Sequence, residues 1–387
     1  MFQSPSYTIP LESVEALRQE LDGLFSLTDT TLDHPEPGQV RFRGYFICDP
    51  AECYDELRGR FERHGFTPLV RPAEIGVMIV ALPTVFDPPD SSWVINLLLF
   101  LVTIASTLYA GASNEPGFTG TELWLGWPFS LSMLLILGAH ELGHYFAARY
   151  HKVPVTLPYF IPFPSFIGTM GAFIRLKAPI KNRRALLDIG AAGPLAGMVF
   201  AVPILLLGLA TSPVGPPPQT GYYQEGNSVL YLLAKFVTQG QCLPDHAPVC
   251  NALASLTGGE GDVAQPTMDI SLNQVAWAGW VGLFVTGLNL IPVGQLDGGH
   301  VSYVLFGRRA RRFFWPAIGG LAVLALLTGA STWWLWILLL FFFGRAYAQP
   351  LDDVTRLDPR RRAIAIFSLV LFFLVFVPVP IQLVLSP

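Results

Sequence analysis

Residues 127–150 read WPFSLSMLLILGAHELGHYFAARY. The stretch is apolar and long enough to cross a membrane, which takes about 20 residues of helix. It nevertheless contains His140, Glu141 and His144, and ionisable side chains at membrane depth are costly enough to indicate a functional site. Histidines four residues apart lie on one face of a helix and can bind one zinc ion. The glutamate between them is placed to act as general base on a metal-bound water.

The composition also indicates a membrane protein. Of the 387 residues, 52% are hydrophobic and only 13% are charged, against roughly 25% charged in a soluble domain. We expect a polytopic α-helical membrane protein with about 6–8 transmembrane helices. The predicted spans are 93–111, 128–149, 184–209, 273–291 continuing to about 306, 313–329, 332–347 and 363–384. The two spans at 313–329 and 332–347 can instead form one long broken element.

Residues 1–88 are predicted to form a small cytosolic α+β domain, ahead of a membrane-embedded metalloprotease domain at 93–384. Apolar residues at helical spacing predict a helix from Leu11 to Leu21, and QVRFRGYFIC at 39–48 has strand character. Asp49-Pro50-Ala51-Glu52 resembles a helix start. Strands FTPLVR and GVMIVAL follow, which suggests half or all of a ferredoxin-like sandwich. Docking, regulation and simple stabilisation remain open as its role. The first 20 residues lack a secretory signal, so we expect the mature chain to start there.

The distribution of basic residues predicts the orientation. Segment 149–184 carries seven lysines and arginines without an acid before 184, and further basic clusters lie at 308–312 and 360–362. Loops 112–127 and 210–271 are acidic, so the positive-inside rule places the N-terminus in the cytosol. Cys48 and Cys53 are then expected to be reduced. Cys242 and Cys250 lie in the outer loop, where a disulfide and two unlinked thiols are equally consistent with the sequence.

A third metal ligand is needed, because catalytic zinc typically has three protein ligands and one open position. The candidate is Asp297 in NLIPVGQLDGGH at 289–300, a carboxylate in an otherwise apolar span. Pro292 and Gly294 are expected to break this helix and aim side chains into a cavity. An ion pair with arginine or a helix cap is the alternative role for Asp297. His300 fits helix packing or water contact better than metal ligation.

These motifs resemble the site-2 protease family of intramembrane zinc metalloproteases, family M50. The resemblance covers about 125–306 and includes the small-residue segment DIGAAGPLAGM at 188–198. It implies that His140, His144 and Asp297 bind one zinc ion and that Glu141 is the acid/base. It also implies that Asn289 holds the substrate backbone, whereas a hydrogen bond between helices is the alternative for Asn289. The outer loop 210–271 contains no recognisable PDZ domain.

Segment 153–180 is too rich in proline for a helix and too apolar for an ordinary cytosolic loop. It resembles the re-entrant β-hairpin of the family. An edge strand at about 168–176 can pair with an extended substrate by strand addition, and Gly168 and Gly171 would permit close backbone approach. A simple interfacial loop without substrate contact is the alternative.

The sequence therefore predicts zinc-dependent intramembrane proteolysis of single-span membrane proteins, in a lipid bilayer and without a nucleic-acid partner. His144 precedes Arg149 by five residues, about 7.5 Å of helix, so the cut is expected near the cytosolic end of the substrate span, in regulated intramembrane proteolysis. We expect the protein in a prokaryotic cell membrane. The rivals are a membrane metallopeptidase acting on non-transmembrane peptides and a non-catalytic scaffold or transporter. A transporter would not need Glu141 between the histidines, and a scaffold would be expected to have lost a ligand or the base.

Overall fold

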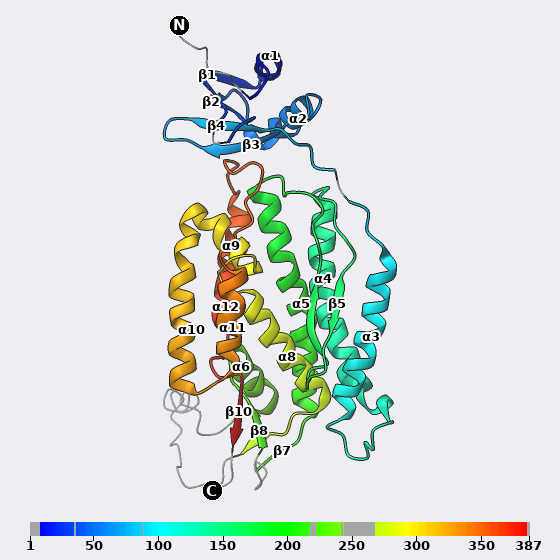
Figure 1. The fold of residues 1–387 in the computed structure, drawn as a ribbon. Coiled ribbons are helices and arrows are strands. Elements are labelled where there is room, and N and C mark those ends of the chain that lie inside the picture. The colour runs from blue at the N-terminus through cyan, green and yellow to red at the C-terminus, as the bar shows by residue number, and fades with distance from the viewer. Residues whose placement is uncertain are drawn as a thin grey trace.

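An N-terminal α+β domain lies on one end of a bundle of long helices (Figure 1). The computed structural model describes residues 8–34, 36–87, 89–216, 222–240, 243 and 268–384. The predicted domain boundaries, 1–88 and 93–384, stay a prediction. The helical part contains the apolar elements expected of a membrane protein.

The N-terminal domain is a four-stranded antiparallel sheet with two helices. The strand order is β1-β2-β4-β3. A ferredoxin-like sandwich has the same order of neighbouring strands, but its chain begins with the strand that corresponds to β4 here. In this domain that strand comes last in the sequence. The sequence did not predict β1, because FSLTDTTL is too polar to show strand alternation. The elements are α1 (Leu11–Gln19), β1 (Phe25–Leu32), β2 (Val40–Phe46), α2 (Pro50–Glu62), β3 (Thr67–Pro72) and β4 (Val77–Leu82).

The predicted start of α2 is confirmed. The Asp49 side chain accepts a hydrogen bond from the backbone N–H of Ala51 at 3.0 Å, and Pro50 occupies the first helical position. Such caps satisfy N–H groups that the helix itself leaves without a partner. Helix α2 buries Leu57 and Phe61 against Phe42 of the sheet.

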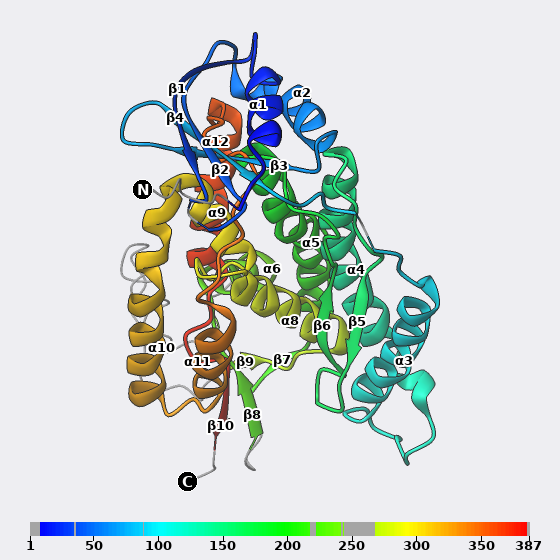
Figure 2. The ribbon, with the colours of Figure 1, turned by 45° about the horizontal axis from the view of Figure 1, so that its top comes forward.

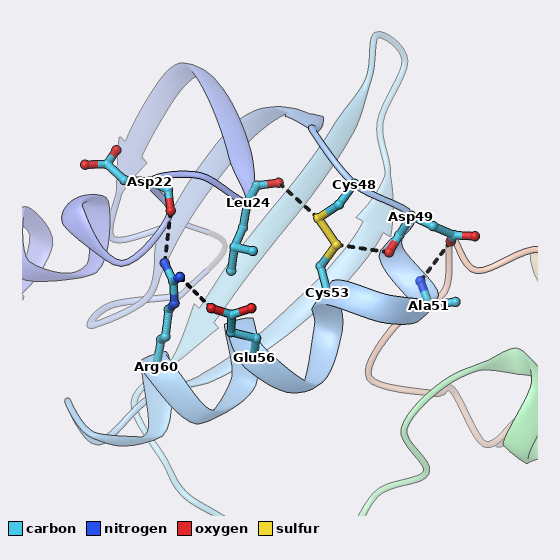
Figure 3. The surroundings of a disulfide bond; sticks show 8 residues. All are labelled: Asp22, Leu24, Cys48, Asp49, Ala51, Cys53, Glu56 and Arg60. Atoms are coloured by element: carbon cyan, nitrogen blue, oxygen red, sulfur yellow. Dashed lines mark hydrogen bonds and ion pairs between the residues drawn. A yellow bond between two sulfur atoms is a disulfide. The ribbon is translucent and has the colours of Figure 1, made fainter.

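A disulfide links Cys48 to Cys53 (Figure 3). The prediction that these two cysteines are reduced thiols was therefore wrong. It rested on compartment alone, whereas the chain turns from β2 into α2 within five residues and brings the two Cα atoms to 6.4 Å, within the usual disulfide range. Cys242 and Cys250 lie outside the described residues, so their state stays a prediction.

The helical domain begins with three long helices and a β-hairpin. Four helical segments are long and apolar enough to cross a membrane by length and composition: 93–112, 123–150, 183–211 and 297–328. The α-helices 93–112, 127–150 and 183–211 agree with the predicted spans 93–111, 128–149 and 184–209 to within two residues at each end. The elements from α3 to α6 are α3 (Trp93–Ala112), η1 (Leu123–Gly126), α4 (Trp127–Tyr150), β5 (Tyr159–Pro162), β6 (Thr169–Phe173), α5 (Arg183–Thr211), β7 (Val214–Gly215), β8 (Tyr222–Glu225) and α6 (Val229–Gln239).

The later elements depart from the predicted spans at prolines and glycines. The predicted span at 273–306 is two helices, α8 and α9, and Gly307, with φ of 58°, ends α9 before η2. The span predicted at 363–384 ends as a helix at Val375, because Pro378 and Pro380 cannot donate backbone hydrogen bonds; β10 then pairs with β8. These elements are β9 (Asp269–Ile270), α8 (Gln274–Asn289), α9 (Asp297–Phe306), η2 (Gly307–Phe313), α10 (Phe314–Thr328), α11 (Thr332–Phe343), α12 (Pro359–Val375) and β10 (Ile381–Val384).

The predicted segment contains an antiparallel hairpin, β5 and β6, with Phe160 opposite Ala172, and its re-entry into the membrane stays a prediction. Figures 1 and 2 show it alongside α4 and α3, at the level of the helices. Its turn rests against α3, where the Ser106 hydroxyl donates to the Gly168 carbonyl at 2.6 Å. The strand expected at 168–176 is shorter and ends at Phe173.

Helices α4 and α5 pack closely because α4 has a glycine where they meet. A Cβ atom on Gly143 would lie 2.5 Å from the backbone oxygen of Ala192 on α5. Gly138, on the same helix, has open space around its Cα. An added methyl group would therefore clash at Gly143 but not at Gly138, although both glycines lie within α4.

We predict that Gly143→Ala lowers the free energy of unfolding by about 1–3 kcal/mol, since the added methyl group must displace α5. Gly138→Ala is the matched control and should stabilise by up to about 1 kcal/mol through helix propensity. Thermal unfolding of the two purified variants in detergent measures the difference. Equal effects of the two substitutions would contradict the packing described for α4 and α5.

Candidate metal centre

His140 and His144 lie on the buried face of α4 and point toward the first residue of α9. Both histidines are less than 10% exposed. Their Nε2 atoms are 3.1 Å apart, and Asp297 Oδ2 lies 3.3 Å from His140 Nε2 and 3.4 Å from His144 Nε2. The three predicted ligands thus converge, although Asp297 follows His144 by more than 150 residues. The cluster can hold one metal ion.

The triangle of donor atoms has the size that zinc requires. Zinc binds histidine nitrogen and carboxylate oxygen at about 2.0–2.2 Å in tetrahedral geometry. Two ligand atoms of such a tetrahedron are separated by about 3.4 Å, close to the three observed distances. Two imidazoles and one carboxylate also match a common catalytic zinc donor set, which leaves a fourth position open. The residues therefore fit one zinc ion.

A backbone carbonyl orients one of the two histidines. The Nδ1 atom of His144 lies 2.7 Å from the carbonyl oxygen of Ile189 on α5. Because a carbonyl only accepts, Nδ1 carries the proton and Nε2 keeps its lone pair for the metal. Metal-binding histidines commonly have such a partner, which holds the ring orientation.

Glycines on α5 make room for the histidine rings. A Cβ atom on Gly193 would lie 2.0 Å from His144 Nε2, and one on Gly197 would lie 3.3 Å from His140 Nδ1. A Cβ on Gly190 would meet the His300 side chain at 2.9 Å. From the sequence, this segment was assigned only by family resemblance. The spacing of 190, 193 and 197 puts all three glycines on one helical face, a signal that could have identified their role.

Asp297 reaches the histidines because the chain leaves the helical path between α8 and α9. Residues 290–296 contain no helix, and Gly294 adopts a φ of +64° that other residues rarely adopt. The segment folds back tightly on the start of α9, since a Cβ on Gly298 would lie 1.9 Å from the Leu290 oxygen. The predicted break at Pro292 and Gly294 is confirmed.

Glu141 faces a cavity of about 220 Å³ that also contains the three donor residues. It is 5% exposed, and its Oε2 atom has no hydrogen-bond partner among the described residues. Ile174, directly after β6, lines the same cavity. A buried carboxylate oxygen without a protein partner, beside a metal cluster, is suited to bind a water molecule.

The remaining predicted residues lie at different places relative to this cavity. Asn289 and His300 line it, and Asn289 Nδ2 is 3.4 Å from His140 Nε2. Gly168 lies in the hairpin turn against α3, where a Cβ would meet the Ser106 oxygen at 2.5 Å. Gly171 lies in β6 with open space around its Cα. The cavity wall on the hairpin side includes Ala172, Phe173 and Ile174. Contact of Gly168 or Gly171 with substrate stays a prediction.

We predict that Gly193→Ala abolishes stoichiometric zinc binding, because its methyl group would occupy the space of the His144 ring. Gly197→Ala should weaken binding much less, since its contact with His140 is only slightly too short. Zinc content after dialysis against a weak chelator, with circular dichroism as a control for folding, measures both. Wild-type zinc retention by a folded Gly193→Ala protein would contradict the role given to this glycine.

Comparisons with known proteins agree with this geometry. The chain is 29% identical over 393 residues to the probable zinc metalloprotease EGY2, chloroplastic, of Arabidopsis thaliana, covering 97% of this chain and 66% of the relative. It is 31% identical over 318 residues to EGY1 of the same plant, covering 75% of this chain and 54% of the relative. The chain thus spans between about half and two thirds of the length of these relatives. No solved structure matches.

Those relatives carry chloroplast names, so they lend no support to the expected prokaryotic membrane, which stays a prediction. The family described as peptidase family M50 matches residues 128–327, more than half of the chain. The match begins in α4, ahead of the two histidines, and extends past Asp297. The chain therefore belongs to peptidase family M50.

Proposed function

We propose that this protein is a zinc-dependent endopeptidase that cleaves a peptide bond inside the membrane. The observation that carries the proposal is the convergence of His140, His144 and Asp297 beside a Glu141 oxygen that no other described residue hydrogen bonds. The cavity that they share lies between apolar helices. The relatives named above are called probable zinc metalloproteases.

The residues divide the chemistry between them. His140, His144 and Asp297 would hold zinc, which when bound supplies a Lewis acid for the scissile carbonyl and acidifies a water molecule. Glu141 Oε2 is placed to accept a proton from that water and to return it to the leaving amine. Asn289, on the cavity wall next to His140, can donate a hydrogen bond to the substrate backbone.

The substrate is proposed to enter as an extended chain. The end of β6 lies beside Glu141, since Phe173, Ile174 and Glu141 line the same cavity. A substrate strand added to β6 would therefore pass the metal cluster, with its backbone bonded to the hairpin rather than left unsatisfied in lipid.

The basic end of the helical bundle is proposed to face the cytosol. The N-terminal domain contacts this end, where Lys181 forms an ion pair with Asp55. The start of α5 and the helix η2 with its four arginines belong to the same basic clusters. Single-span membrane proteins would then be cut near their cytosolic end, in regulated intramembrane proteolysis.

We predict that Glu141→Gln lowers kcat by at least about 10²-fold, the low end of the range for losing a general base, while zinc stays bound. Asp297→Asn should lose both activity and zinc, because it weakens a metal ligand. Purified protein in nanodiscs with a single-span substrate, together with zinc analysis, separates the two. Cleavage by Glu141→Gln at the wild-type rate would overturn the assigned mechanism.

We also predict that cleavage depends on how easily the substrate helix unwinds. A substrate span with Gly-Pro near its basic end should be cut faster than the same span with Leu-Leu, because less helix must be broken. A soluble peptide with the same cleavage sequence is the control. If the soluble peptide were cut well and the span not at all, the protein would act on non-transmembrane peptides instead.

A further inference from the structure

Residues 350–356, which we call the linker strand, join the N-terminal domain to the helical bundle. The linker strand lies between α11 and α12 and reaches β3 in Figure 1. Val70 of β3 donates its N–H to the Leu351 oxygen at 2.8 Å and accepts from the Asp353 N–H at 3.0 Å. On the other side, Leu351 and Asp352 donate to Ile180 and Lys181, each at 2.8 Å. The linker strand is thus paired on both edges.

The sequence of β3 restricts this pairing to one residue. Alternate residues of a strand direct their N–H and C=O groups to the same side, so Pro68, Val70 and Pro72 share the edge that faces the linker strand. The two prolines have no N–H group, and the Pro68 oxygen already accepts the Tyr54 hydroxyl at 2.8 Å. Val70 therefore supplies the one N–H donor among these three positions. Arg71 reinforces the pairing through hydrogen bonds to the Pro350 and Leu351 oxygens at 2.9 and 2.8 Å.

The Asp353 side chain connects the linker strand to two helices of the bundle. Its carboxylate accepts from Arg183 Nε at 2.8 Å and from the Tyr303 hydroxyl at 3.0 Å. Asp353 is 2% exposed, and a buried carboxylate that loses its partners is strongly destabilised. The ion pair and the hydroxyl therefore hold the ends of α5 and α9 against the same group.

Helices α5 and α9 each connect a residue that contacts Asp353 to the metal site, and the two connecting stretches have the same length. Arg183 precedes Ile189, whose carbonyl orients His144, by six residues of α5. Tyr303 follows Asp297 by six residues of α9. Six residues of helix measure about 9 Å, and both stretches are continuous helix. One carboxylate thus sets the position of a metal ligand and of the carbonyl that orients another ligand.

We propose that Asp353 is a positioning residue for the zinc site and that the N-terminal domain holds it in place through Val70. The inference rests on the proposed function in that the cluster binds zinc. The N-terminal domain would thus act on the metal centre from a distance, because all three ligand residues among the described residues belong to the helical domain. Separating the domain from the linker strand would leave Asp353 free to move and would loosen the spacing of the three donors.

Zinc release tests the role of Asp353. We expect Asp353→Asn, Tyr303→Phe and Arg183→Gln each to accelerate release to a chelator by about tenfold, the low end of the effect known for outer-shell partners of metal ligands. Combining Asp353→Asn with Tyr303→Phe should add little further effect, because both remove the same contact. Should Asp353→Asn fail to fold, Tyr303→Phe alone decides the question.

Asp352→Asn is the matched control. Its carboxylate is also buried, but it bonds within the linker strand, to Val354 and Thr355. Burial raises the pKa of this carboxyl against the hydrogen bonds that lower it, so an amide is expected to be tolerated there. Zinc release from Asp352→Asn should match the wild type.

Val70→Pro tests the role of the N-terminal domain. Proline removes the N–H that bonds to Leu351, on a side of β3 that does not face β4. Val70→Pro should accelerate zinc release as much as Asp353→Asn does. The double variant should release zinc no faster than either single variant. Ile79→Val, which weakens the domain core opposite Val70 in the β3–β4 register by about 0.5–1.5 kcal/mol, should not.

Unchanged zinc release in both Asp353→Asn and Val70→Pro would overturn the proposal, whatever the peptidase activity. Unfolding temperatures that fall while zinc release stays at the wild-type rate would assign Asp353 a purely structural role and would also overturn it. A wild-type protein that binds zinc but cleaves no substrate would overturn the proposed function and leave these zinc measurements valid.

Discussion

The close approach of helix backbones around the three metal-ligand residues governs how the helices of the bundle pack. Donors from α4 and α9 must come within about 3.4 Å of one another in apolar surroundings, where unsatisfied polar groups are costly. Ordinary side chains on α5 would keep the helices apart. Gly193 and Gly197 remove that obstacle, and Gly143 lets α4 settle against α5 at the same level.

This constraint also explains the broken chain before Asp297. A continuous helix through 274–306 would bury its backbone well but could not fold back on itself. The non-helical turn at 290–296 is possible because α9 packs directly on it, at Gly298 and Gly299. Irregular backbone at membrane depth is tolerated where protein surrounds it. The sequence motif around Asp297 is therefore a folding requirement as much as a chemical one.

Most of the site could be predicted from sequence because its chemistry is local. His140, Glu141 and His144 lie within one helical turn, and Asp297 lies in a recognisable motif. The glycine contacts were missed because they depend on which helix faces α4, and no local pattern records that. The linker strand was missed for a similar reason: Val70 and Leu351 are 281 positions apart, and neither is unusual in its neighbourhood.

The state of Cys48 and Cys53 was predicted wrongly because the expected compartment was used in place of chain geometry. Strand β1 was missed because pairing with β2, rather than its own composition, makes it a strand.

The pairing of Val70 with Leu351 has a consequence for the order in which the protein is assembled. Domains generally fold as units from the N-terminus during synthesis, and the N-terminal domain has its own core. Its backbone pairing through Val70 must wait for residues 350–353, which are made after α11. The proposed positioning of Asp353 by the N-terminal domain therefore becomes possible only after residues 350–353 have been made. A nascent chain would carry both histidines and Asp297 before residues 350–353 can position them, which delays a competent protease until those residues have been made.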